Sequence, residues 1–267
     1  MADTLFEPVG RGAWLPTERS RGPWSADALH GGPVAALLAR EAEHLPSGTP
    51  EPLQPVRLTL ELLRPAPLVP LAVSARLVRP GRKVQLVEAE AAVDAGGERK
   101  VIARATLLRL RTADVAVPAG LPEVVPPPPS SGTAGDPGWS DDETVAFHNA
   151  GVEHAFVLGH FRRLGPATDW IRLKVPVVPD EAPSPFQRVV AAADFGNGVS
   201  SLMDPSRMSF VNPDLTVYVH RLPEGEWVCL EATTLAGGHG LGFAESALYD
   251  ERGRIGRAVQ SLLIDVR

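Results

Sequence analysis

The sequence is poor in cysteine and lysine. Its single cysteine, Cys229, excludes a disulfide within the chain, and its apolar surroundings at residues 227–230 predict a buried thiol in a strand. Only Lys83, Lys100 and Lys174 are lysines among the 26 basic residues. This bias toward arginine, together with abundant alanine, valine and proline, indicates a bacterial source with GC-rich DNA.

Long hydrophobic runs are also missing. The longest apolar run near a predicted helix, residues 33–39, is far shorter than the ~18 residues that a membrane span needs. The first residues lack the basic segment and apolar core of a secretion signal. We therefore expect a cytoplasmic protein without a membrane span. The net charge of −6 and the absence of a basic stripe argue against a nucleic-acid partner.

Several signatures of common active sites are absent as well. The sequence has neither a His-Glu-x-x-His motif nor paired cysteines, the usual spacings of zinc ligands. It also lacks the Gly-x-Ser-x-Gly turn that carries the nucleophile of many serine hydrolases. We expect a site that uses no metal and no cofactor.

Proline, in contrast, is abundant, with 27 among 267 residues, roughly twice the average usage. Many prolines lie in residues 112–139, where four occur in a row at 126–129. Such a composition favours an extended spacer over packed structure. The spacer divides the chain into an N-terminal domain, residues 1–111, and a C-terminal domain, residues 140–267.

The two parts repeat one order of elements, a buried helix followed by strands with alternating apolar residues. The predicted helices span residues 27–44 and 184–194, and the predicted strands span residues 56–63, 71–78, 84–93, 101–110, 215–221, 227–234, 242–249 and 255–266. Leu58-Thr59 before Arg64 matches Leu215-Thr216 before Arg221, which favours duplication. We expect an α+β fold, a tandem or double hotdog, in which each half is a long buried helix wrapped by an antiparallel sheet.

Two segments carry a family resemblance. Residues 22–39, which include His30-Gly31-Gly32, and residues 56–65, which end in Leu-Arg-Pro, resemble the first hotdog of the double-hotdog acyl-CoA thioesterases, the thioesterase II family. The resemblance implies hydrolysis of an acyl-CoA to free acid and coenzyme A, and a place in lipid metabolism.

Thioester hydrolysis needs a carboxylate to activate water and amide donors to receive the oxyanion. In hotdog thioesterases of the His-Gly-Gly type, glycine begins the helix and an acid follows about eight residues later. Here Ala39 stands eight residues after Gly31, whereas Asp194 on the second helix stands eight residues after Phe186. The glycine and the acid thus lie on different helices. This predicts one composite site per chain and a pseudo-symmetric second site that lacks both the glycine and the acid.

The resemblance also implies partners for Asp194, the residue that binds the nucleophilic water. The family's glutamine matches Gln260, and its threonine falls at Asn212, with Thr216 on the same strand as a second candidate.

The remaining site candidates lie at the start of the first helix. Gly31 and Gly32 are the expected oxyanion donors, His30 is expected to hydrogen-bond the helix start, and Trp24 to pack over the entrance near the ligand.

Each of these residues also has a structural interpretation. Asp194 could cap its helix, Gln260 could bond the backbone, Asn212 before proline suits a turn, and the glycines could permit close packing.

Two other functions compete with hydrolysis. Double-hotdog hydratases and dehydratases that act on enoyl thioesters share an Asp-x-Asn-Pro-x-His run, and its histidine is missing after both Asp194 and Asn212. A non-catalytic acyl-thioester-binding protein is the other alternative, which the asparagine at position 212 keeps open. A homo-oligomer is compatible with either function.

Overall fold

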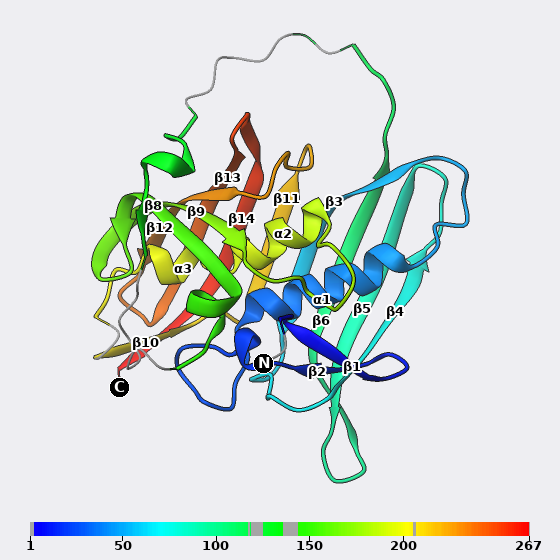
Figure 1. The fold of residues 1–267 in the computed structure, drawn as a ribbon, viewed down its shortest axis with the longest axis horizontal. Coiled ribbons are helices and arrows are strands. Elements are labelled where there is room, and N and C mark those ends of the chain that lie inside the picture. The colour runs from blue at the N-terminus through cyan, green and yellow to red at the C-terminus, as the bar shows by residue number, and fades with distance from the viewer. Residues whose placement is uncertain (1–2, 117, 119–124, 136–143, 205–206, 267) are drawn as a thin grey trace.

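The computed structural model describes residues 3–116, 118, 125–135, 144–204 and 207–266. The described residues form one 14-stranded antiparallel sheet with two main helices against it (Figure 1). No helix among them is long and apolar enough to cross a membrane. Cys229 is fully buried in a strand, as predicted.

The strands of the first part lie in the spatial order β1-β2-β4-β5-β6-β3, and those of the second part continue as β11-β14-β13-β12-β9-β8-β7, with β10 paired to β14. Their bounds are β1 Phe6–Gly10, β2 Ala13–Pro16, β3 Leu53–Leu62, β4 Leu71–Arg79, β5 Val84–Asp94, β6 Arg99–Arg111, β7 Thr133–Ala134, β8 Val152–His160, β9 Arg163–Leu173, β10 Met208–Val211, β11 Asp214–Val219, β12 Val228–Ala236, β13 Leu241–Asp250 and β14 Gly253–Val266.

Strands β3 and β11 join the two parts of the sheet. Their register places Thr59 opposite Thr216 and Leu58 opposite Val217, so the two threonines that correspond in the sequence repeat lie opposite each other. Leu58 and Val217 are buried against the helices, whereas the two threonines lie on the other face with their hydroxyls 3.3 Å apart. Each strand thereby covers the edge of the other, which removes two open edges from the fold.

The main helices are α1, Gly31–His44, and α2, Pro185–Ala193, and the short α3, Gly196–Val199, follows α2. Helix α1 contacts β3–β6, α2 contacts β9, β11 and β12, and α3 covers β12–β14. Short helical turns occur at Glu18–Ser20, Pro129–Ser131 and Phe147–Gly151. Both main helices lie along the inner side of the curved sheet (Figure 1). Their apolar runs explain this place, because α1 is buried from Gly31 through Ala39.

The predicted helices and strands are present, with small changes at their ends. The first helix begins at Gly31 rather than at residue 27, because His30 is its N-cap. The strands that were not predicted are β1, β2, β7, β8, β9 and β10. The region of β8 and β9 mixes histidine, glycine and charged residues, so it lacks the alternation of the predicted strands.

The predicted spacer is packed in part. Trp170 Nε1 donates a hydrogen bond to the carbonyl of Pro127, and Thr133–Ala134 pairs with β8. This end of residues 112–139 therefore belongs to the sheet of the second part, while residues 117, 119–124 and 136–139 lie outside the described residues.

Candidate active site

Helices α1 and α2 run antiparallel, so the end of α2 lies at the start of α1. Asp194 is the C-cap of α2, and its carboxylate lies 2.8 Å from Nδ1 of His30, the N-cap of α1. An acid at a helix C-terminus is unfavourable for its own helix, but here it faces the positive end of the neighbouring helix dipole. The side chains of both residues are buried. The position of Asp194 therefore joins the two helices rather than only capping one.

Two amide side chains hold the carboxylate from the other side. Asn212 Nδ2 donates to Oδ1 of Asp194 at 2.9 Å, and Gln260 Nε2 donates to the same oxygen at 3.1 Å. Gln260 also donates to the backbone carbonyl of Asp194 at 3.2 Å. The structure thus brings together Asp194, Gln260, Asn212 and His30, as the sequence led us to expect.

These contacts explain the ionisation of Asp194. Burial by itself raises the pKa of a carboxyl group, but the nearby His30 and the hydrogen bonds from His30, Asn212 and the Gly32 amide outweigh it. The pKa of Asp194 consequently lies below its ordinary value, and the group is an ionised carboxylate at neutral pH. An ionised carboxylate has lone pairs that can hold a water molecule and accept its proton.

Gly31 and Gly32 allow the helices to approach closely at this point. A Cβ on Gly31 would lie 2.7 Å from a carboxylate oxygen of Asp194, and a Cβ on Gly32 would lie 2.6 Å from the carbonyl of Ala191. The first amides of a helix have no acceptor within the helix, and that of Gly31 is one of them. The glycine pair therefore permits close packing and also presents amide donors beside the carboxylate.

His30 is held among aromatic rings. Its ring centre lies 5.4 Å from that of Trp24, 5.1 Å from that of Phe147 and 4.6 Å from that of Phe195. Nδ1 of His30 also lies 3.1 Å from the Gly32 amide, which confirms its expected place at the helix start. Trp24 is 58% exposed, so it forms the outer wall of the site, over the helix entrance.

Thr216 does not join the site. Its neighbours Leu215 and Val217 face the helices, so Thr216 faces the opposite side of the sheet, where it meets Thr59. Of the two candidates for the family's threonine position, only Asn212 contacts Asp194. The parity of β11 explains the place of Thr216, because successive residues of a strand point to opposite faces. Asn212 lies before β11 begins and does not follow that alternation.

Asn197 is a part of the site that sequence reasoning missed. Its backbone amide donates to Oε1 of Gln260 at 3.2 Å, which fixes the amide orientation that lets Nε2 reach Asp194. The run Asp194-Phe-Gly-Asn197 was visible in the sequence, but no spacing rule indicates that α3 would turn this amide toward β14.

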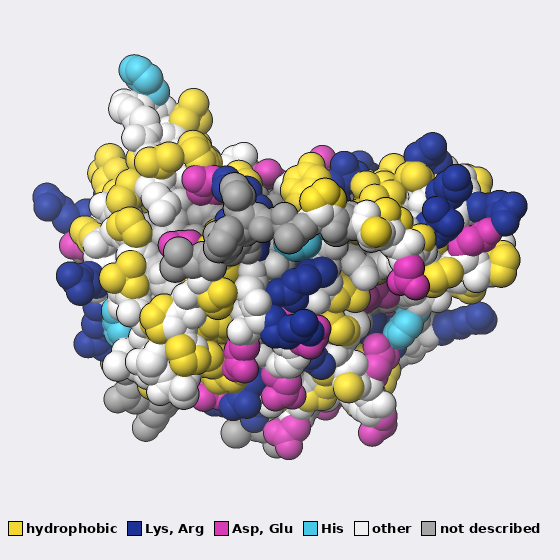
Figure 2. All heavy atoms as spheres, turned by 90° about the horizontal axis from the view of Figure 1, so that it is seen from above, with side chains coloured by type: hydrophobic (Ala, Val, Ile, Leu, Met, Phe, Trp, Pro, Cys, Tyr) yellow, Lys and Arg dark blue, Asp and Glu magenta, His cyan; other side chains and the backbone are white. Residues whose placement is uncertain are grey.

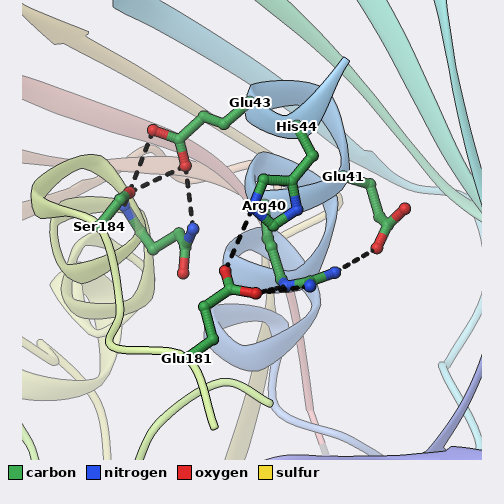
Figure 3. Close-up of polar contacts among 7 residues, drawn as sticks. Arg40, Glu41, Glu43, His44, Glu181 and Ser184 are labelled. Carbon is green, nitrogen blue, oxygen red and sulfur yellow. Dashed lines mark hydrogen bonds and ion pairs between the residues drawn. The ribbon is translucent and has the colours of Figure 1, made fainter. Parts of the chain in front are cut away.

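A second acidic residue lies at the other end of the helix pair, where the end of α1 meets the start of α2. Glu43, one turn beyond Ala39, accepts hydrogen bonds from Ser184 Oγ at 2.8 and 3.0 Å and from Gln187 Nε2 at 3.0 Å (Figure 3). Ser184 is the N-cap of α2. The pseudo-symmetric site thus has no glycine pair, as predicted. The prediction that it also lacks an acid was wrong, because Glu43 lies there and its carboxylate binds the start of α2.

We expect Glu43→Gln to preserve or raise stability at neutral pH. Burial raises the pKa of Glu43 despite the hydrogen bonds from Gln187 and Ser184 and the nearby His44 and Arg109. Because the pKa of Glu43 is higher in the folded state than in the unfolded chain, the wild type loses stability as the pH rises through the folded-state pKa. Glutamine stays neutral and avoids that loss. Thermal unfolding at pH 5 and pH 8 should show a gain that grows with pH. Glu41→Gln, two residues earlier on α1 and paired with Arg40, is the control. A loss that grows with pH would contradict the expectation.

We expect Asn212→Ala to shift the pH dependence of activity. The variant loses one of the hydrogen bonds that lower the pKa of Asp194, so that pKa rises and the carboxylate is protonated at higher pH. The acid limb of kcat/KM should move to higher pH, with a smaller change on the alkaline side. Asn149→Ala, which removes an exposed asparagine bonded to the carbonyl of Thr144 and the amide of Ala146, should leave the profile in place. A limb that stays or moves to lower pH would exclude this role.

Within the described residues, no group of three or more His, Cys, Asp or Glu side chains could hold a metal ion. The chemistry available at Asp194 is that of a carboxylate, two amide side chains, an imidazole and backbone amides.

Comparisons with known proteins identify the family of the chain. Residues 20–110 match the acyl-CoA thioesterase N-terminal domain, and residues 120–264 match the acyl-CoA thioesterase C-terminal domain. None of the curated proteins is significantly similar in sequence.

Solved structures share the fold at low sequence identity. A protein from Thermobifida fusca YX that was provisionally assigned as a thioesterase II has a TM-score of 0.72 at 19% identity, covering 99% of this chain and 96% of that one. A hot dog fold protein of unknown function from Alicyclobacillus acidocaldarius has a TM-score of 0.69 at 18% identity, covering 99% and 96%. An acyl-CoA thioesterase II from Mycobacterium marinum has a TM-score of 0.65 at 15% identity, covering 98% and 96%. The fold is therefore a hotdog fold, and the chain belongs to the acyl-CoA thioesterase family, whose N-terminal and C-terminal domains it carries in that order.

Proposed function

We propose that this chain hydrolyses an acyl-CoA to free acid and coenzyme A with water activated by Asp194. The observation that carries the proposal is the buried, ionised carboxylate of Asp194 beside the first amides of α1. A general base and a set of oxyanion donors are the two groups that hydrolysis of a thioester requires.

In this mechanism Asp194 takes a proton from water while the water oxygen attacks the thioester carbonyl. The negative charge that develops on the carbonyl oxygen is received by the amide of Gly31 at the positive end of α1. The amide of Gly32, the other expected oxyanion donor, already donates to Nδ1 of His30 and holds the helix start in place. When the tetrahedral intermediate collapses, the carbon–sulfur bond breaks, and the thiolate of coenzyme A takes the proton from Asp194. Acid and thiol are released, and the carboxylate is restored.

Gln260 and Asn212 orient the carboxylate in this proposal. Both donate to the same oxygen, Oδ1, which leaves Oδ2 directed toward His30 and the start of α1. A carboxylate has about four acceptor positions, so the water can bind beside the existing donors. The thioester would approach past Trp24, the exposed residue of the site.

We also propose that the fold is a double hotdog with domains at residues 1–111 and 140–267 joined by residues 112–139. The antiparallel α1 and α2 and the central pairing of β3 with β11 support this division. One site per chain follows from it, because Gly31 and Asp194 come from different halves.

An enoyl-thioester hydratase or dehydratase is a second candidate. The sequence lacks the histidine of the usual run, yet the fold brings His30 to 2.8 Å from Asp194, so an acid–base pair is present. His30 begins α1 and is surrounded by rings, which favours a role in holding Asp194 over one in proton transfer to carbon.

One assay separates the candidates. The purified chain is incubated with saturated acyl-CoAs of increasing length and with the matching enoyl-CoAs. Thiol release is followed with a chromogenic reagent, and loss of the conjugated double bond by absorbance. Thiol release from saturated substrates supports the proposal. Loss of the double bond without thiol release indicates a hydratase, and binding without either change indicates a non-catalytic acyl-thioester-binding protein.

Further features remain predictions. We propose a cytoplasmic enzyme of bacterial lipid metabolism that binds no nucleic acid. The face in Figure 2 carries both basic and acidic side chains. A homo-oligomer would have a surface available on the outer side of the sheet, where Leu241 and Leu263 pair and are more than half exposed.

A further inference from the structure

A second pair of histidine and aspartate lies inside the protein. His154 on β8 and Asp169 on β9 approach to 2.6 Å between Nδ1 and Oδ2, and their side chains are 1% and 0% exposed. Asp169 is opposite Phe156 in the register, so it shares the inner face of the sheet with His154 and lies diagonally from it. Neither residue belongs to the site described above.

Stability does not explain this pair. Among the described residues, Nε2 of His154 and Oδ1 of Asp169 have no hydrogen-bond partner. Buried polar atoms without partners are costly, and apolar residues of similar volume often replace buried ionic pairs without loss of stability. Such a pair in a native protein calls for another explanation.

The surroundings of His154 connect it to Asp194. The ring centre of His154 lies 4.8 Å from that of Phe195, in an edge-on arrangement. The ring of Phe195 also lies 4.6 Å from that of His30. Phe195 directly follows Asp194 and precedes α3. Phe195 therefore lies between two pairs of the same kind, His30 with Asp194 and His154 with Asp169.

We propose that His154 and Asp169 are positioning residues for the reaction, which hold the ring of Phe195 against His30 and so keep His30 in contact with Asp194. This inference rests on the proposed function. The hydrogen bond between Asp169 and Nδ1 fixes the plane of the imidazole, and Phe161 also packs against that ring, with centroids 4.9 Å apart. With the imidazole fixed, the ring of Phe195 stays packed against both histidines.

The central test is the double variant His154→Leu/Asp169→Val, which replaces the pair with apolar side chains. If the pair served stability, the melting temperature would fall and kcat per folded molecule would not change. We expect the opposite, an unchanged or higher melting temperature, a kcat lower by about 10-fold or more, and a KM within about 2-fold, because small displacements of a catalytic group lower turnover. A wild-type kcat overturns the proposal.

Two further variants show whether the effect passes through Phe195. Asp169→Asn keeps a hydrogen-bonding group for Nδ1 and should retain most of the kcat, whereas a loss as large as that of the double variant contradicts the orienting role. Phe195→Leu should lower kcat by the same order, and adding the double variant to it should lower kcat no further. Full additivity overturns the proposal. A wild-type kcat in Phe195→Leu overturns it even if the double variant does not fold.

The substrate for these measurements is the acyl-CoA that the wild type hydrolyses fastest. Asp194→Asn is measured alongside. If that variant keeps its turnover, the proposed function itself fails. If it loses turnover while the double variant does not, only the positioning role is rejected.

Discussion

Asp194→Asn is expected to lower the turnover of the best acyl-CoA substrate by about 10²- to 10⁴-fold, the range over which a positioned general base acts. Asparagine cannot accept the proton of the attacking water. The pKa of Asp194 lies below its ordinary value, so the wild-type base is fully ionised at neutral pH and its entire contribution is lost in the variant. Steady-state measurement of thiol release gives the change in kcat.

The variant should remain folded. The amide oxygen of asparagine can still accept from Asn212 and Gln260, and its nitrogen can donate to Nδ1 of His30. Asp250→Asn is a matched control, because Asp250 is a buried aspartate whose charge serves an ion pair with Arg221. That control should lose stability and keep its kcat. Unchanged turnover in Asp194→Asn would rule out the proposed mechanism.

Gly31→Ala should have the second-largest effect, a fall in kcat of about 100-fold. Its Cβ would lie 2.7 and 2.9 Å from the two carboxylate oxygens of Asp194, closer than a Cβ atom approaches other heavy atoms in proteins. The carboxylate cannot move aside freely, because Asn212, Gln260 and His30 hold it. A displacement of about 1 Å at a catalytic group is enough for a loss of this size.

Gly198→Ala tests whether the loss of kcat is specific to position 31. Gly198 is also a helical glycine, but a Cβ there would meet no atom within 4 Å. Alanine favours a helix over glycine, so this variant should keep its kcat and gain up to about 1 kcal/mol of stability. Comparable kcat values for Gly31→Ala and the wild type would show that Gly31 does not limit the approach of Asp194.

The helices and most strands could be predicted because their apolar patterns are strong. The composite site could be predicted in part, since the spacing of glycine and acid placed Gly31 and Asp194 on different helices. The alternation of its strand argues against Thr216 as a site residue. Leu215 and Val217 are apolar and face the core, so Thr216 between them faces the other side of the sheet.

Other parts of the site depend on tertiary contacts that a sequence does not display. Glu43 was not predicted because a spacing of eight residues from Gly31 leads to Ala39. Helix α1 continues for another turn beyond Ala39, and Glu43 contacts the start of α2 there. His154 and Asp169 meet through the register of two strands whose sequences gave no strand pattern. Asn197 takes part through its backbone amide, which no side-chain motif reveals.

The antiparallel helix pair has two unlike ends, and both belong to one chain. In a symmetric homodimer, every substitution appears at both ends of such a pair, so an acid that fastens one end must also occupy the other. Here Glu43 fastens the start of α2 while Gly31 leaves space beside Asp194. Because the two ends differ, the protein can anchor its helices at one end and keep the closest approach of the helices at the other end, where we propose the reaction takes place.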